Sequence, residues 1–125
     1  MKTILAVDDS ATMRALLGNA LRSQGHDVAF ADDGTTALDV LRSTSWPRGA
    51  PDLVITDINM PRMDGFELIE NIRRNERLRS TPILVLTTES SPEKRARAKS
   101  AGATGWIVKP FSAEKINAAI RLVCP

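Results

Sequence analysis

Five short apolar runs alternate along this chain with segments whose apolar residues recur at helical spacing. The runs span residues 3–7, 27–31, 52–56, 82–87 and 105–109. Three of them are nearly continuous in Val, Ile and Leu, which is typical of strands covered on both faces. The run at 27–31 alternates more and is expected nearer an edge. Repeated strand and helix predict an α/β fold, with a doubly wound five-stranded parallel sheet between two layers of helices.

Each segment between the runs begins at a residue that can cap a helix. The capping residues are Ser10, Asp33, Asp64, Ser91 and Ser112. Their side-chain oxygens can accept hydrogen bonds from the free N–H groups of a first turn. Asp64 and Glu67 have the spacing of a capping box, and Pro92 suits a first helical position. We therefore expect five helices.

Two of these helices have distinctive apolar faces. The first is expected to bury Met13, Leu16, Leu17, Ala20 and Leu21, which follow a helical repeat. The fourth, at about 91–101, has only small apolar residues and four nearby bases, so it should be the least firmly packed. Its charged side chains are expected to be solvated, and a partner-docking surface is the sharper alternative. Residues 43–51 are predicted to form a loop with Trp46 partly buried.

Length and composition exclude several classes of protein. A chain of 125 residues suits one domain, expected to span 1–125. The net charge of +2 gives only weak support for nucleic-acid binding. The single Cys124 allows no intrachain disulfide, which fits a reducing compartment. No apolar segment approaches the roughly 20 residues of a membrane span. We expect a cytoplasmic monomer that neither enters the membrane nor binds nucleic acid.

Polar residues lie at or just beyond the ends of four of the predicted strands. They are Asp8 and Asp9, then Asp57, then Thr87, and finally Lys109. Ligands of open parallel sheets bind beyond the carboxyl ends of the strands, so these side chains are expected to converge. Three clustered carboxylates repel one another unless a cation lies between them. Oxygen ligands suit Mg²⁺, so we predict a Mg²⁺ site built from the three aspartates and a carbonyl of the following loop.

Lys109 and Thr87 remain available for an anion. A lysine suits phosphate as a point charge, and a threonine hydroxyl can donate a hydrogen bond. Together with a metal and a carboxylate, they predict a phosphoryl-transfer site with Asp57 as the acceptor. Each acid alone could be a helix cap and Lys109 a surface base, but that interpretation is poor for four strand ends together.

Four short segments carry a more specific signal. They are VDDS (7–10), DINMPRMDG (57–65), LTTES (86–90) and GWIVKPF (105–111). In this order they resemble the receiver domain of two-component response regulators, and the resemblance covers essentially the whole chain. With no attached output domain, the chain is most similar to single-domain regulators of chemotaxis. The resemblance implies a flavodoxin-like sheet with the strand order 2-1-3-4-5.

The resemblance also implies roles for the residues at the strand ends. Asp57 would receive a phosphoryl group from a phosphohistidine on a histidine kinase. Asp9 and Asp57 would bind Mg²⁺ directly, Asp8 through water, and Asn59 through its main-chain carbonyl. Lys109 and Thr87 would bind the phosphoryl oxygens.

A switch and its timing are implied in the same way. Thr87 would move to the phosphate while Trp106, where the family more often has tyrosine or phenylalanine, turns inward. Asn59, Thr88 and Glu89 would tune hydrolysis of the phosphoryl group. The protein would catalyse only its own phosphorylation and dephosphorylation.

The surface that partners recognise would be the fourth helix, fifth strand and fifth helix. The implied partners are a histidine kinase, the flagellar motor switch and a phosphatase. The family often has a cis bond before the proline that follows Lys109.

Four other functions compete with this interpretation. ADDGT (31–35) superficially matches the signature of haloacid dehalogenase phosphatases, but Ala31 occupies the position of the nucleophile. A flavin or nucleotide module would need a glycine-rich phosphate loop that the sequence lacks. A nucleic-acid binder would use Arg73, Arg74, Arg77 and Arg79, which lack interleaved aromatic residues. A receiver that acts as a phosphate sink or relay without a motor target remains open, because its chemistry is identical.

Overall fold

The computed structural model describes residues 1–43 and 45–125. Within these residues, five strands and five helices alternate along the chain. The strands are β1 (Thr3–Val7), β2 (Asp27–Ala31), β3 (Leu53–Thr56), β4 (Ile83–Thr87) and β5 (Gly105–Val108). The helices are α1 (Ala11–Arg22), α2 (Gly34–Arg42), α3 (Gly65–Arg74), α4 (Pro92–Ala101) and α5 (Ala113–Val123). The predicted strands are confirmed, with ends within one residue of the apolar runs.

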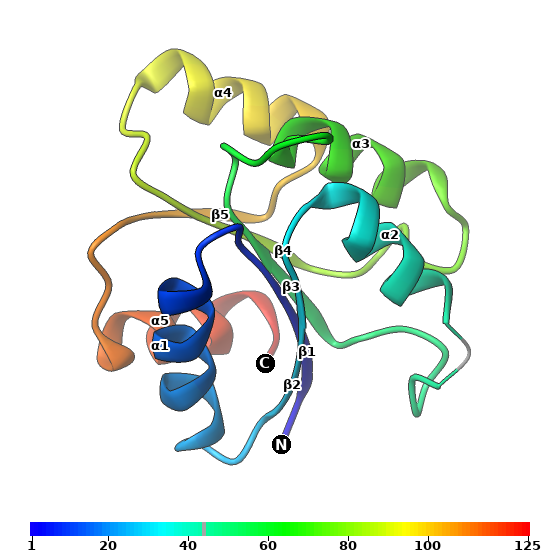
Figure 1. Ribbon diagram of the computed structural model, residues 1–125, viewed down its shortest axis with the longest axis vertical. Helices are drawn as coiled ribbons and strands as arrows, with labels where there is room; N and C mark the ends of the chain where they lie inside the picture. The colour runs from blue at the N-terminus through cyan, green and yellow to red at the C-terminus, as the bar shows by residue number, and fades with distance from the viewer. Residues whose placement is uncertain (44) are drawn as a thin grey trace.

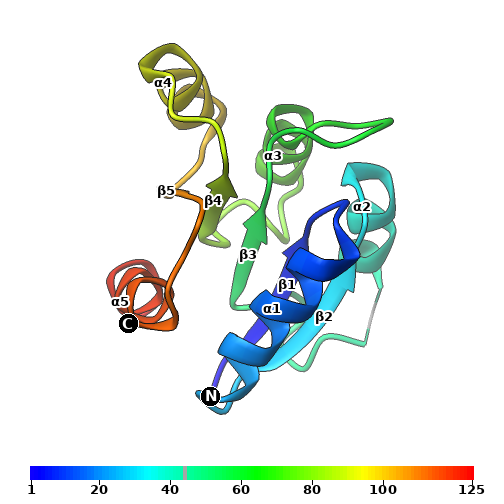
Figure 2. The same ribbon diagram turned by 60° about the vertical axis from the view of Figure 1, so that its left-hand side comes forward.

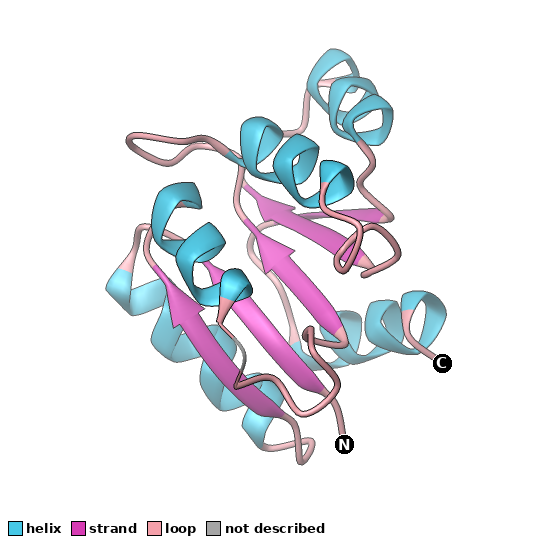
Figure 3. Ribbon diagram, turned by 90° about the vertical axis from the view of Figure 1, so that its right-hand side faces the viewer, coloured by secondary structure: helices cyan, strands magenta, loops and turns pink. Residues whose placement is uncertain are grey.

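The strands form one parallel sheet (Figure 3). Their order is β2-β1-β3-β4-β5, which confirms the predicted topology and places β2 at an edge (Figure 2). From β1 the chain first adds β2 on one side, and then crosses to build β3, β4 and β5 on the other. The strand order therefore reverses between β1 and β3. This reversal leaves a crevice beyond the carboxyl ends of the two strands, where ligands of such sheets bind.

The sheet is covered on both faces. Figures 1 and 2 show α1 and α5 on one face and α2, α3 and α4 on the other. Along β1, Ile4 and Ala6 pack in the core under α1 and α5, whereas Leu5 and Val7 pack in the core under the other three helices. Successive side chains of a strand point to opposite faces. Burial of both faces is why the strand sequences are continuously apolar.

The helix starts follow the predicted caps. In each helix the capping side chain accepts a hydrogen bond from a backbone N–H three residues further along. The caps are Ser10, Asp33, Asp64, Ser91 and Ser112. Pro92 occupies the first position of α4, as expected. None of the helices in the described ranges is both long and apolar enough to cross a membrane.

The predicted face of α1 was wrong in part. Leu16 was expected in the core but is 53% exposed. The buried stripe is centred on Leu17, Gly18 and Leu21 instead. A Cβ at position 18 would lie 2.6 Å from the Phe30 ring, so the ring packs directly on the glycine. Glycine is not counted as an apolar residue when a helical repeat is identified. The repeat therefore placed the buried face of α1 too close to Leu16 and left out Gly18.

The lightly packed fourth helix and the loop before β3 agree with expectation. All ten residues of α4 are described, and Ala98 is the one that is buried. Arg97 adds an anchor, with its guanidinium 4.0 Å from the centre of the Phe66 ring on α3. In the loop at 43–51, Trp46 is half-buried and donates a hydrogen bond of 3.1 Å to the carbonyl of Val40. Residue 44 of this loop lies outside the described residues.

Candidate functional site

Main-chain hydrogen bonds hold the residues just beyond the strands at one edge of the sheet. The N–H of Asp57 donates to the carbonyl of Val7 at 3.0 Å, and the N–H of Lys109 donates to the carbonyl of Thr87 at 2.7 Å. Both bonds continue a parallel ladder by one residue past the strand end. The side chains of Asp57 and Lys109 therefore start from fixed positions above the reversal point, where Asp8 follows β1.

Three carboxylates meet at this edge, as the sequence predicts. Asp8 and Asp57 are 3% and 8% exposed, and Asp9 is on the solvent side. One oxygen from each of the three lies within 4.8 Å of the others. Mg²⁺ bonds of about 2.1 Å in octahedral geometry separate ligand oxygens by about 3.0 to 4.2 Å. The donor set is all oxygen, compact and open on the Asp9 side, so these residues fit a hydrated Mg²⁺ ion.

Lys109 joins two of the acids. Its ammonium nitrogen lies 2.8 Å from Oδ2 of Asp8 and 2.9 Å from Oδ2 of Asp57, and its side chain is 9% exposed. Burial alone would lower the pKa of the amine, but the hydrogen bonds and negative charges of the two carboxylates outweigh burial and raise the pKa of Lys109. The group is therefore a fixed cation at neutral pH. The Lys109–Pro110 peptide bond is cis, as the resemblance implies.

The backbone after Asp57 orients its carboxylate. The N–H of Ile58 donates to Oδ1 of Asp57 at 2.6 Å, whereas Oδ2 faces Lys109. The start of α3 lies against this turn, and the N–H of Gly65 donates a hydrogen bond of 2.8 Å to the carbonyl of Ile58. A Cβ at position 65 would lie 2.3 Å from the carbonyl oxygen of Asp57, so only glycine fits. The sequence shows Asp64 followed by glycine as a turn signal, but nothing in it reveals this close approach.

The loops beside Asp57 are connected through Glu89. Its carboxylate accepts hydrogen bonds from the Asn59 side chain at 3.1 Å and from the Lys94 ammonium at 2.9 Å. These contacts, with Lys94 the stronger, lower the pKa of Glu89. The Glu89 N–H donates to the buried hydroxyl of Thr87 at 3.3 Å, and Thr88 between them is exposed. The three residues predicted to tune hydrolysis therefore lie near the end of β4, and their role stays a prediction.

Thr87 and Trp106 lie on the same face of the sheet. In the β4–β5 register, Trp106 pairs with Val85 and Thr87 pairs with Val108. Residues two apart on a strand share a face, so the two side chains are diagonal neighbours. This placement is what the predicted threonine–aromatic switch requires, although the movement itself stays a prediction.

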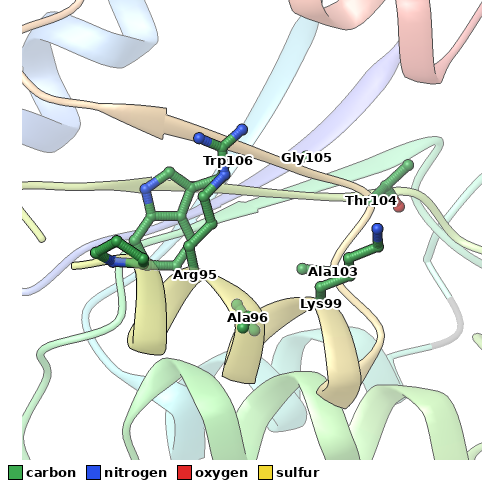
Figure 4. A pocket seen from close by; sticks show the side chains of 9 residues that line it. Arg95, Ala96, Lys99, Ala103, Thr104, Gly105 and Trp106 are labelled. Atoms are coloured by element: carbon green, nitrogen blue, oxygen red, sulfur yellow. The ribbon is translucent and has the colours of Figure 1, made fainter. Parts of the chain in front are cut away.

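Trp106 is half-buried and forms one wall of a hollow of about 440 Å³ between α4 and β5. Figure 4 shows its indole beside the Arg95 side chain at one end, with Lys99 and Thr104 toward the other. The floor of the hollow is made of small residues of α4 and of the turn before β5. The lightly packed face of α4 is thus a concave, positively charged surface next to the aromatic residue.

A doubly wound sheet with acids and a lysine at the reversal of its strand order defines a class of signalling domain. The chain belongs to the response regulator receiver domain family, whose model matches residues 4–121. It is therefore a CheY-like receiver of two-component signalling, which is a signalling module and not a classical enzyme.

Among its relatives, chemotaxis protein CheY-3 of Vibrio cholerae is 46% identical over 115 residues, which are 91% of this chain and 85% of that protein. Chemotaxis protein CheY of Pseudomonas aeruginosa is 41% identical over 121 residues, which are 96% of this chain and 94% of that protein. The solved structure of the chemotaxis response regulator CheY4 of Vibrio cholerae superposes with a TM-score of 0.89. That chain is 42% identical, and the match covers 98% of both chains.

Proposed function

We propose that residues 1–125 act as one receiver domain that controls chemotaxis through phosphorylation of Asp57 by a histidine kinase. The observation that carries the proposal is the buried Lys109 ammonium, which lies 2.9 Å from the Asp57 carboxylate. A fixed cation beside a nucleophilic carboxylate is suited to an incoming phosphoryl group. The chemotaxis role rests on the similarity to chemotaxis proteins of Vibrio cholerae and Pseudomonas aeruginosa.

In this proposal Asp9 and Asp57 bind Mg²⁺ directly, Asp8 binds it through water, and Asn59 contributes its main-chain carbonyl. The compact cluster of carboxylate oxygens supports the assignment. When bound, Mg²⁺ neutralises negative charge on the phosphoryl oxygens and so allows the carboxylate to approach them.

The chain's own residues perform the transfer. An oxygen of Asp57 attacks the phosphorus of the phosphohistidine, an O–P bond forms, and the P–N bond breaks with its electron pair left on the imidazole nitrogen. The Ile58 N–H holds Oδ1 of Asp57 and thereby orients the carboxylate. Lys109 transfers its ion pairs from the carboxylates to a phosphoryl oxygen, and the Thr87 hydroxyl donates to another.

This last contact starts the switch. Thr87 gives up the hydrogen bond that it accepts from the Glu89 N–H, and Trp106 turns into the space that the threonine leaves. The hollow between α4 and β5 then changes shape, and with it the surface formed by α4, β5 and α5. The partner that binds this surface in a chemotaxis pathway is the flagellar motor switch. Asn59, Thr88 and Glu89 set the rate of hydrolysis, with help from a phosphatase.

Intact mass measurement tests the proposal. The chain is incubated with a small acyl phosphate and Mg²⁺, and we expect a mass gain of one phosphoryl group in the wild type and none in Asp57→Asn. Absence of the gain in the wild type would contradict phosphorylation. Retention of a flagellar motor switch protein only by the phosphorylated chain would support motor control, whereas lack of phosphorylation-dependent retention would favour a phosphate sink.

A further inference from the structure

We infer that Arg62 is a positioning residue for the metal site: its ion pair with buried Asp33 holds the β3–α3 loop, and Asn59 within it, against the start of α2. The inference rests on the proposed Mg²⁺ site. Neither residue touches the carboxylate cluster, so Arg62 would act through the loop and not on the metal itself.

Asp33 is a buried carboxylate with two separate tasks. Its side chain is 0% exposed, and Oδ1 accepts the N–H of Thr36 at 2.8 Å as the cap of α2. Oδ2 is paired with the guanidinium of Arg62. The pKa of Asp33 is lowered, first by the Thr36 N–H and also by Arg62, although burial opposes the shift. The group is therefore charged, and the cation that its buried Oδ2 faces is Arg62, whose own side chain is 63% exposed.

The backbone at Arg62 has an unusual conformation. Its φ of 65° lies in the left-handed region, which is uncommon for residues other than glycine. Such conformations persist where their surroundings determine them. Here the turn also contains a short-range hydrogen bond of 2.7 Å from the N–H of Met63 to the carbonyl of Pro61. The left-handed turn directs Arg62 toward α2.

A second contact beside the ion pair fastens the same loop to α2. The N–H of Gly34 donates to the carbonyl of Met63 at 3.2 Å. A Cβ at position 34 would lie 2.7 Å from Cγ of Met63, so the loop packs directly on the helix start. Consecutive residues of the loop, Arg62 and Met63, therefore contact consecutive residues of the α2 start, Asp33 and Gly34.

These contacts determine how freely Asn59 can move. The loop is tied down on either side of it, at Asp57 through the ladder with β1 and at Gly65 through its bond to Ile58. Arg62 ties it to α2 between these points. Outer contacts that orient a metal ligand typically change metal affinity by about 10- to 100-fold. For a contact that acts through the loop, we expect the lower end of this range, about tenfold.

The experiment measures binding of Mg²⁺ alone, from the rise in Tm as Mg²⁺ is added, because a ligand of the folded state stabilises it according to its affinity. Arg62→Gly removes the ion pair and tolerates the left-handed backbone. Asp33→Asn removes the charge and keeps a residue that caps helices well. Arg74→Ala, on the exposed side of α3, loses the same unit of charge and is the matched control. Arg62→Lys tests rescue by a cation. Backbone hydrogen exchange at residues 59–63 is recorded for every variant.

We expect Arg62→Gly and Asp33→Asn each to weaken Mg²⁺ binding by about tenfold, which is the lower end of the effect of losing a contact that orients a metal ligand. Both variants should also speed backbone hydrogen exchange at residues 59–63. The double variant should lose no more than either single one, Arg62→Lys should recover most of the affinity, and Arg74→Ala should bind as the wild type does. Wild-type affinity in both Arg62→Gly and Asp33→Asn would overturn the inference alone. No Mg²⁺ response in the wild type would overturn the proposed metal site, and the inference with it.

Discussion

The ammonium of Lys109 and the carboxylate of Asp57 form an ion pair of 2.9 Å between residues 52 positions apart in the sequence. Both groups are largely buried, so the pair is shielded from solvent and from salt. The same nitrogen contacts Asp8 at 2.8 Å. Lys109 thus holds two acids together, and it lies where a phosphoryl group on Asp57 would need a counter-charge.

Replacing Lys109 should make stability depend on Mg²⁺. In Lys109→Met the carboxylates of Asp8 and Asp57 lose their common cation, and we expect a loss of about 3 kcal/mol, as for one partner of a buried ion pair. Added Mg²⁺ should recover much of the loss, because the ion supplies the missing positive charge. Thermal unfolding with and without Mg²⁺ measures both effects. An equal loss in the two conditions would argue against a shared cation site.

Gly65 should be intolerant of a methyl group. In Gly65→Ala the new Cβ would lie 2.3 Å from the Asp57 carbonyl oxygen, so the turn that carries the acceptor must shift. We expect a loss of about 1 to 3 kcal/mol, as for overpacking, and slower phosphorylation. Chemical denaturation and the rate of phosphate uptake measure the two effects.

Gly25→Ala is the control for this prediction. Gly25 has a φ of +83° and no atom within 4 Å of an added Cβ, so alanine there introduces backbone strain far from the site. We expect stability to fall and the phosphorylation rate to stay unchanged. If both variants slowed phosphorylation equally, the close approach at Gly65 would not be the cause.

The sequence predicted those features that depend on neighbours along the chain. The strands, the helix caps and the residues at the strand ends are local signals, and one topological rule brings Asp8, Asp57 and Lys109 together. Contacts between loops could not be read in this way. The pairing of Arg62 with Asp33 depends on how two loops meet above the sheet, and Leu16 was misplaced because the Phe30 ring packs on a glycine.

The contribution of Asp33 to the stability of the folded state should be lost at acidic pH. Its pKa is lowered from an ordinary 3.8, chiefly by the Thr36 N–H, so the folded state binds the proton less readily than the unfolded state. The stability that this provides is complete above about pH 4 and is lost as the pH falls through the folded-state pKa. We expect wild type to exceed Asp33→Asn in Tm at pH 5 to 7, and the difference to shrink below pH 4. A difference that stays constant down to pH 2 would contradict the assignment.

Phosphorylation should change the fluorescence of Trp106. The measurement uses Trp46→Phe, because Trp46 packs on the core beside β2 and would add a constant signal. The half-buried Trp106 should become less exposed as it turns inward, with a blue shift on addition of a phosphodonor and Mg²⁺. The same protein carrying Asp57→Asn is the control. An unchanged spectrum in a protein that mass measurement shows to be phosphorylated would exclude the aromatic switch.

We expect Asp57 to receive a phosphoryl group from a kinase histidine in a reaction that needs the carboxylate cluster. The most direct measurement follows transfer from a phosphorylated histidine kinase of the chemotaxis type to this chain, with the modified residue located by peptide mass spectrometry. We predict rapid loss of phosphate from the kinase, its recovery on Asp57, and little transfer when Mg²⁺ is chelated or Asp57 is replaced by asparagine. Equal transfer without Mg²⁺, or phosphate on a residue other than Asp57, would contradict Mg²⁺-dependent phosphorylation of Asp57.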